Sequence, residues 1–174
     1  MRSLKPLAAS HFWIGFVVDD AAEAMARWSR VYGVGPFEHH PRIQLPCIYR
    51  EQPAHLDFEA YTACTDSPGI RLICDYTPRR SVFKDLADIY GNPLSGFTLL
   101  SLRTSEFDTL SVQYAKNDYE LACELNPPGQ RIAIYDTVPD FGFFTEVVEA
   151  VASDHHSAHL YCPHVRQGHH DDQD

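Results

Sequence analysis

The 174-residue sequence predicts an α+β fold made of two successive β-α-β-β-β modules. The first observation behind this prediction is an order of apolar runs, helix caps and turns that repeats after roughly 85 residues. The second is the composition, 44% hydrophobic and 22% charged, which is typical of a globular domain. A chain of this length can bury roughly 70% of its unfolded surface, so it needs no disulfide or structural metal to fold.

The first module begins with an apolar run at residues 12–18, which predicts a strand buried on both faces. Asp20 is followed three residues later by Glu23, a capping box that predicts a helix running to about Tyr32. The remaining segments of this module are extended and bounded by turn residues, at 36–50, 55–64 and, after a turn at 67–69, 70–76.

The second module repeats this order after a linking stretch with a short helix at 81–90. Thr104 or Ser105 is expected to cap a helix that ends near Asn117. The strands of this module are expected at 97–103, 119–125, 130–137 and 143–149.

These elements predict one domain at residues 1–152, with module one at about 11–78 and module two at about 96–150. A tail at 153–174 follows and holds six of the ten histidines. Its histidines can bind metal, but their spacing fits no defined zinc motif, so we expect a solvated, flexible terminus.

The charge and the cysteines exclude several classes of protein. The net charge of −10 and the scattered basic residues argue against nucleic-acid binding. No secretory signal and no apolar run near 20 residues is present, which predicts a soluble cytoplasmic protein. In that reducing compartment the thiols are expected to be free, and none belongs to a C-x-x-C pair: Cys47, Cys64, Cys74, Cys123 and Cys162.

Five short motifs occur in a fixed order along residues 11–149. They are WIGFVVDD (13–20), AMARW (24–28), GVGPF (33–37), RIAIYDT (131–137) and EVVE (146–149). In this order the motifs resemble the vicinal-oxygen-chelate superfamily, closest to its glyoxalase-like branch that includes methylmalonyl-CoA epimerase. The resemblance implies that the two modules close into a cup of mixed strands, and homodimers are common among such proteins.

The same resemblance implies a divalent cation held by four side chains, which stabilises an enolate-type charge on the substrate. The two histidine positions of the family fall on Trp13 and Leu99, neither of which ligates a cation. The fourth-strand carboxylate falls on Ile73 or Cys74, depending on the turn that sets the register. Only the last position keeps the ligand type of the family, as Glu146, so we expect a degenerate site without a metal or other cofactor.

The resemblance places one carboxylate in an apolar cup, an arrangement suited to general acid–base chemistry. We therefore expect a catalytic group drawn from Glu146, Tyr135 and His39. The expected substrate-binding side chains are apolar or aromatic: Trp13, Phe16, Tyr76 and Leu99. If the metal ligands have instead moved along their strands, the alternative set is His11, Asp75 and Glu146.

Three functions follow from these residues. The first is a metal-independent isomerase or lyase that moves a proton on a small apolar carbonyl or aromatic compound. The second is a non-catalytic small-molecule binding protein, as in the bleomycin-resistance branch of the family. The third is a metal-dependent lyase, epimerase or dioxygenase that uses the relocated ligands.

Overall fold

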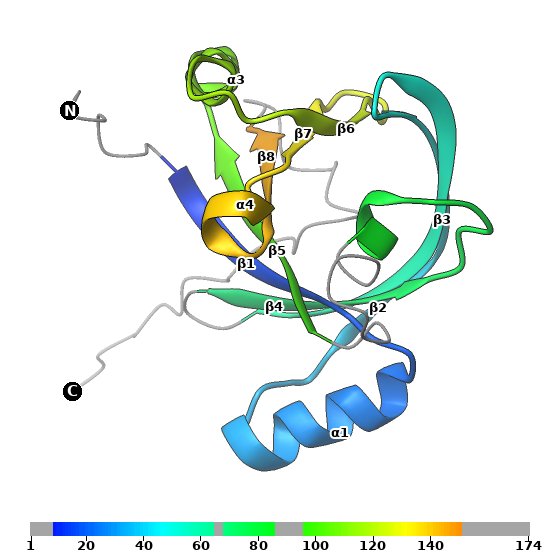
Figure 1. The fold of residues 1–174 in the computed structure, drawn as a ribbon. Coiled ribbons are helices and arrows are strands. Elements are labelled where there is room, and N and C mark those ends of the chain that lie inside the picture. Colours follow the sequence, from blue (N-terminus) through cyan, green and yellow to red (C-terminus); the bar gives the residue numbers. More distant parts are fainter. Residues whose placement is uncertain (1–8, 65–67, 86–95, 151–174) are drawn as a thin grey trace, which may run out of the picture.

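A computed structural model describes residues 9–64, 68–85 and 96–150. Within them eight strands form one closed barrel in the order β1-β4-β3-β2-β6-β7-β8-β5, which Figure 1 shows with helices packed outside it. The predicted α+β class and the predicted cup of mixed strands are confirmed. The predicted tail at 153–174 lies outside the described residues.

The elements of the first module are β1 (Ala9–Val17), α1 (Ala21–Tyr32), β2 (Glu38–Tyr49), β3 (Gln52–Ala63) and β4 (Gly69–Asp75). Those of the second are β5 (Gly96–Thr104), α3 (Phe107–Lys116), β6 (Leu121–Leu125), β7 (Ile132–Tyr135), α4 (Val138–Phe141) and β8 (Phe144–Glu149). The connection that precedes β5 includes one helical turn at residues 82–85.

The two modules are arranged alike around the barrel. The first contributes β1-β4-β3-β2 and the second contributes β5-β8-β7-β6, each with its first strand parallel to its last. Antiparallel pairs between β1 and β5 and between β2 and β6 join them. Because closure leaves no free sheet edge, every strand backbone finds partners on both sides.

Alternation along the strands separates two cores. Inside the barrel, side chains from all eight strands pack together, among them Trp13, Phe58, Leu99, Ile134 and Phe144. The opposite face of the second module packs under α3 and holds a smaller cluster: Leu102, Phe107, Leu110, Ala133, Tyr135 and Val147.

The helix boundaries follow local capping. The Oδ1 of Asp20 accepts from the backbone N–H of Glu23 at 2.9 Å, so the predicted cap of α1 is confirmed. The predicted cap of α3 at Thr104 or Ser105 is wrong, because the N-cap is Glu106. Thr104 instead accepts from the backbone N–H of Glu106 at 2.9 Å, one residue before the helix begins.

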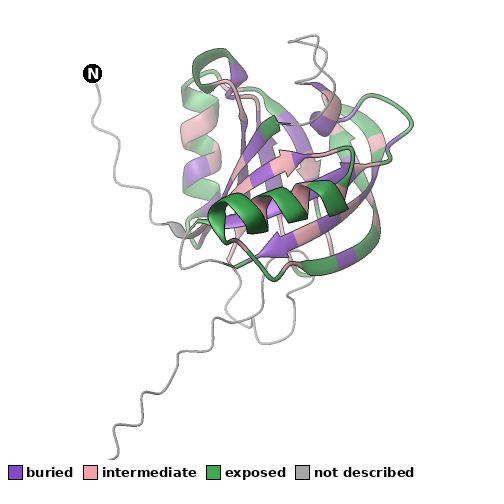
Figure 2. Ribbon diagram, turned by 90° about the horizontal axis from the view of Figure 1, so that it is seen from below, coloured by how far each residue is buried: buried purple, intermediate pink, exposed green. Residues whose placement is uncertain are grey.

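Helix α1 buries none of its residues and stands at the surface, as Figure 2 shows by its exposed colouring beside the buried strands. The free thiols of Cys47, Cys74 and Cys123 are buried. Cys64 is disulfide-bonded, so the expectation that it carries a free thiol is wrong. Disulfides persist mainly in oxidising compartments, so a cytoplasmic location stays a prediction.

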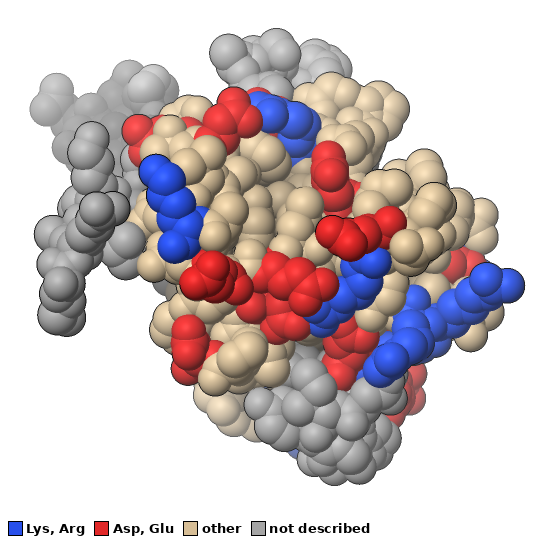
Figure 3. All heavy atoms as spheres, turned by 45° about the horizontal axis from the view of Figure 1, so that its top comes forward, with Lys and Arg blue, Asp and Glu red and all other residues tan. Residues whose placement is uncertain are grey.

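Acidic side chains gather on the face shown in Figure 3, in keeping with the net charge of −10. In the described part of the chain, no helix is both long and apolar enough to cross a membrane.

Candidate functional site

An ion pair lies inside the barrel between Arg71 on β4 and Glu146 on β8. The guanidinium Nη2 donates to the carboxylate Oε2 at 2.7 Å, and the two side chains are only 6% and 7% exposed. Two charges this deeply buried are costly unless each neutralises the other. Glu146 is therefore buried in the cup as expected, but a cation compensates its charge.

The pair lines a small cavity whose other walls are apolar. The walls come from five strands and from the turn at 82–85: Leu45, Leu56, Phe58, Ile73, Phe83, Leu125, Ile132 and Ile134. The cavity volume is about 20 Å³, which holds about one water molecule. In this conformation the site is closed to a substrate.

The turn at 82–85 closes the cavity from outside the strands. The Phe83 side chain is 4% exposed and packs edge-on against Phe58, with ring centroids 5.4 Å apart. Asp85 anchors the turn by accepting from the Tyr49 hydroxyl and, at 3.0 Å, from the Arg50 guanidinium. Burial and the bond to Asp85 raise the pKa of Tyr49 to about 12, so this hydroxyl stays protonated.

Trp13 fills the interior beside Gly69, its partner on β4. A Cβ added at Gly69 would lie 2.5 Å from the Trp13 ring, so the glycine makes room for the indole. Leu99 is fully buried in the same core. Both residues lie inside the cup as predicted.

Strand register shows which residues occupy equivalent places in the two modules. Trp13 pairs with Gly69, and Leu99 pairs with Phe144. If Trp13 and Leu99 are equivalent, the residues two further along β4 and β8 are Arg71 and Glu146. On that equivalence the residue of β4 that corresponds to Glu146 is Arg71, whereas the sequence motifs pointed to Ile73 or Cys74.

On the same equivalence, the four positions that the resemblance compares with metal ligands are Trp13, Arg71, Leu99 and Glu146. This set offers one carboxylate, and a guanidinium already binds it. A divalent cation needs several convergent N, O or S donors, so these four residues do not fit one.

In the described part of the chain, no group of three or more His, Cys, Asp or Glu is placed to hold a metal. Asp75 accepts from the backbone N–H of Thr77 at 2.9 Å and from the Ser81 hydroxyl at 3.0 Å. Glu146 is bound to Arg71 instead. His11 lies on β1, opposite Arg103 of β5.

The remaining predicted site residues lie away from Glu146. Tyr135 belongs to the cluster under α3, where its ring stacks on Tyr114 with centroids 4.5 Å apart. Tyr76 is 45% exposed, with the Arg42 guanidinium 4.8 Å from its ring centroid. Phe16 packs outside the barrel against Trp28 of α1. The expected positions of Phe16 and Tyr76 beside the substrate, and of Tyr135 as a catalytic residue in the cup, are therefore corrected.

His39 also points out of the barrel, where it stacks on Tyr61 and lies 3.6 Å from the Glu59 carboxylate. Its neighbour His40 faces inward instead. His40 is 6% exposed, and its Nε2 lies 2.8 Å from the Thr62 hydroxyl. Adjacent strand residues face opposite sides, so only one of the two histidines can be internal.

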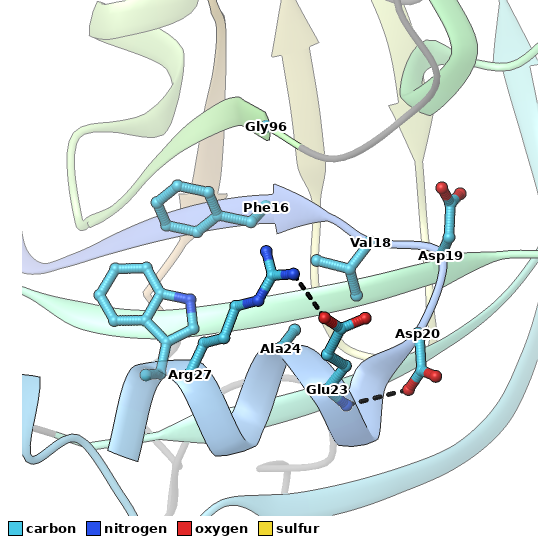
Figure 4. A pocket seen from close by; sticks show the side chains of 9 residues that line it. Phe16, Val18, Asp19, Asp20, Glu23, Ala24, Arg27 and Gly96 are labelled. Atoms are coloured by element: carbon cyan, nitrogen blue, oxygen red, sulfur yellow. Dashed lines mark hydrogen bonds and ion pairs between the residues drawn. The ribbon is translucent and has the colours of Figure 1, made fainter. Parts of the chain in front are cut away.

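A second, open cleft of about 390 Å³ lies between α1 and the ends of β1 and β5. Figure 4 shows the Arg27 guanidinium reaching along α1 to the Glu23 carboxylate, with Phe16 and Val18 on the barrel side of the cleft. The Arg27 and Glu23 side chains are 66% and 61% exposed. Such exposed pairs contribute little binding energy, so the internal cavity is the stronger candidate site.

Sequence reasoning missed Arg71 and Phe83. The signal for Arg71 was present, because an arginine inside the apolar segment 70–74 needs a buried counter-charge. Glu146 stands in the equally apolar segment 144–148 and was the natural partner. Phe83 had no such signal, since nothing local shows that a linker turn supplies a wall of the cavity.

Solved structures share this fold at low sequence identity. A hypothetical protein, BH1468 from Bacillus halodurans C-125, aligns with a TM-score of 0.55 and 11% identity over 83% of this chain and 96% of that chain. Methylmalonyl-CoA epimerase from Mycobacterium tuberculosis aligns with a TM-score of 0.53 and 15% identity over 86% of this chain and 93% of that chain. A selenomethionine form of methylmalonyl-CoA epimerase aligns with a TM-score of 0.51 and 14% identity over 84% of this chain and 99% of that chain.

No family model and no curated protein matches the sequence. The structural likeness establishes the fold, while the function has to be argued from the site.

Proposed function

We propose that the protein is an isomerase or lyase that moves a proton on a small apolar carbonyl compound without a metal. The observation that carries this proposal is the buried pair of Arg71 and Glu146, which faces an apolar cavity. The pair combines a proton acceptor and a fixed positive charge at one place, which are the two groups that enolisation requires.

The chemistry follows from the roles of the two groups. The Glu146 carboxylate takes the proton from the carbon next to the carbonyl group, and the C–H electron pair forms the new C=C bond. The carbonyl π electrons move to oxygen, and the Arg71 guanidinium stabilises the resulting enolate. Glu146 then returns the proton to carbon, or the enolate expels a leaving group from the β-carbon.

Arg71 can serve both partners because a guanidinium carries five N–H donors in a fixed plane. One of them bonds to Glu146. Arg71 thus supplies the positive charge that a metal ion would supply in a metal-dependent protein of this fold. It does so from the position in the first module that is equivalent to that of Glu146 in the second.

The cavity must enlarge before a substrate enters, because it now holds about one water molecule. Seven of the eight apolar wall residues belong to barrel strands, which are fixed by their hydrogen-bonded neighbours. Phe83 comes from the turn at 82–85, so its displacement opens the site with least disruption.

Deuterium exchange tests the proposal without knowledge of the natural substrate. Small aldehydes, ketones and thioesters are incubated with the protein in D₂O containing EDTA, and α-deuteration is followed by NMR. We expect enzyme-dependent exchange of at least one compound and its loss in Glu146→Gln. Absence of exchange across the panel would overturn the proposal, and exchange that requires added metal would favour a metal-dependent enzyme.

The second candidate is a protein that binds an apolar ligand without changing it. It is favoured by the lining of the cavity, where eight of the ten residues are apolar. Under this alternative, the protein binds one of the panel compounds without exchanging its α-protons, and Glu146→Gln weakens that binding.

A further inference from the structure

Ser101 lies on β5, where its register partner on β8 is Glu146 of the ion pair, and its hydroxyl is buried. Ser101 is 1% exposed, and within the described residues its Oγ has no hydrogen-bond partner. Leaving a buried hydroxyl unbonded costs about 1–3 kcal/mol. Such a group in a native protein calls for an explanation, of which a bound ligand is one.

The strand register places Ser101 next to the reacting groups. On one side it pairs with Glu146 of β8, and on the other with Trp13 of β1. It shares a face of β5 with Leu99, whose side chain lies in the interior core. Neighbouring strands are about 4.8 Å apart, so the Ser101 backbone lies about one strand spacing from that of Glu146. Ser101 is not among the residues that line the present cavity, so its hydroxyl meets a substrate only after the cavity has enlarged toward β5.

We infer that Ser101 is a further catalytic residue, which donates a hydrogen bond to the carbonyl oxygen of the substrate together with Arg71. This inference rests on the proposed function. Two donors on one oxygen stabilise the enolate more than the starting carbonyl, because the negative charge develops there. Ser101 donates without exchanging its proton, while Glu146 alone takes and returns the α-proton.

The same residues define the charge of the substrate. The site already contains one cation and one anion, and these neutralise each other. A substrate with its own carboxylate would add a third buried charge, for which this pair has no counterpart. The substrate class is therefore an uncharged ketone, aldehyde or thioester, not a 2-oxo acid.

The experiment compares wild type, Ser101→Ala and the control Ser111→Ala in the exchange assay. The hydroxyl of Ser111 on α3 bonds to the Phe107 carbonyl at 2.9 Å, outside the barrel. We expect Ser101→Ala to slow exchange by about 100-fold and Ser111→Ala to leave the rate within about 2-fold. The matched probes are 2-butanone and 2-oxobutyrate, and only the uncharged ketone should exchange.

Thermal unfolding supplies a readout independent of turnover. Removing an unbonded hydroxyl should leave the melting temperature of Ser101→Ala unchanged or higher, whereas a structural hydroxyl would lower it. If the alanine variant fails to fold, Ser101→Cys keeps nearly the same volume with a weak donor, and the same loss of exchange is expected.

The outcomes separate the two proposals. Wild type that exchanges no compound defeats the proposed function itself. Wild type that exchanges while Ser101→Ala keeps the full rate overturns the role of Ser101 alone. Exchange of 2-oxobutyrate at the rate of 2-butanone overturns the requirement for an uncharged substrate.

Discussion

Replacing Arg71 by methionine tests the ion pair on which the candidate site depends. The partners are 6% and 7% exposed, so solvent screens their interaction little. Removing one member leaves the other charge buried and unpaired, which costs about 3–5 kcal/mol. For a chain of this size each kcal/mol shifts the melting temperature by roughly 2–4 °C, so Arg71→Met should melt about 6–20 °C lower.

The double variant Arg71→Met with Glu146→Met distinguishes pairing from simple loss of packing. Replacing both charges by apolar side chains is often neutral or stabilising, so we expect stability within about 1 kcal/mol of wild type or above it. Unfolding in urea measures Arg71→Met, Glu146→Met and the double variant. The control is Arg27→Met, which breaks an exposed pair with Glu23 and should cost under about 0.5 kcal/mol. Additive single effects in the double variant would refute the buried pair.

Two further predictions concern the turn at 82–85 and acid stability. Phe83→Ala should lower the free energy of unfolding by about 3–5 kcal/mol and enlarge the cavity beside the ion pair. Benzene should then raise the melting temperature of the variant but not that of wild type. If benzene has no effect on the variant, Phe83 does not form a wall of the cavity. The Arg42 guanidinium holds the pKa of the Asp57 carboxyl below its usual value of 3.8. The ionised Asp57 carboxyl stabilises the protein fully at pH values above its pKa in the unfolded chain, and this stabilisation is lost as the pH falls through its pKa in the folded protein. The difference in melting temperature between wild type and Asp57→Asn should therefore shrink below about pH 4. A difference that does not change with pH would contradict this.

The fold was predictable because its signals are local and ordered. The cap at Asp20, the apolar opening strand and the closing segment around Glu146 each constrain one element, and together they predict two modules of the same order. The closed barrel also places Glu146 in the interior, as the family position implied.

The positions of the aromatic residues were not predictable from periodicity. Along β7, Ile134 faces the barrel and Tyr135 faces α3, yet both positions are apolar and buried because a core lies on each side. A strand buried on both faces loses the alternation that identifies its inner side. Phe16 on β1 was misplaced for the same reason, since α1 and Phe97 cover that outer face.

Arg71 was missed because the register of β4 was set from the turns that flank it. Those turns allow Ile73 or Cys74 at the ligand position, whereas pairing of β4 with β1 puts Gly69 opposite Trp13 and Arg71 two residues further. Register in a parallel pair depends on long-range contacts and on no short motif.

The opposite charges at equivalent positions of the two modules also bear on how the barrel assembles. Two copies of the first module, paired in the same geometry, would bring two Arg71 guanidiniums together in a dry interior, and two copies of the second would oppose two Glu146 carboxylates. Either homotypic pairing leaves like charges buried without compensation. Only the pairing of a first module with a second module neutralises both charges. The buried ion pair therefore disfavours assemblies in which two copies of the same module pair with each other.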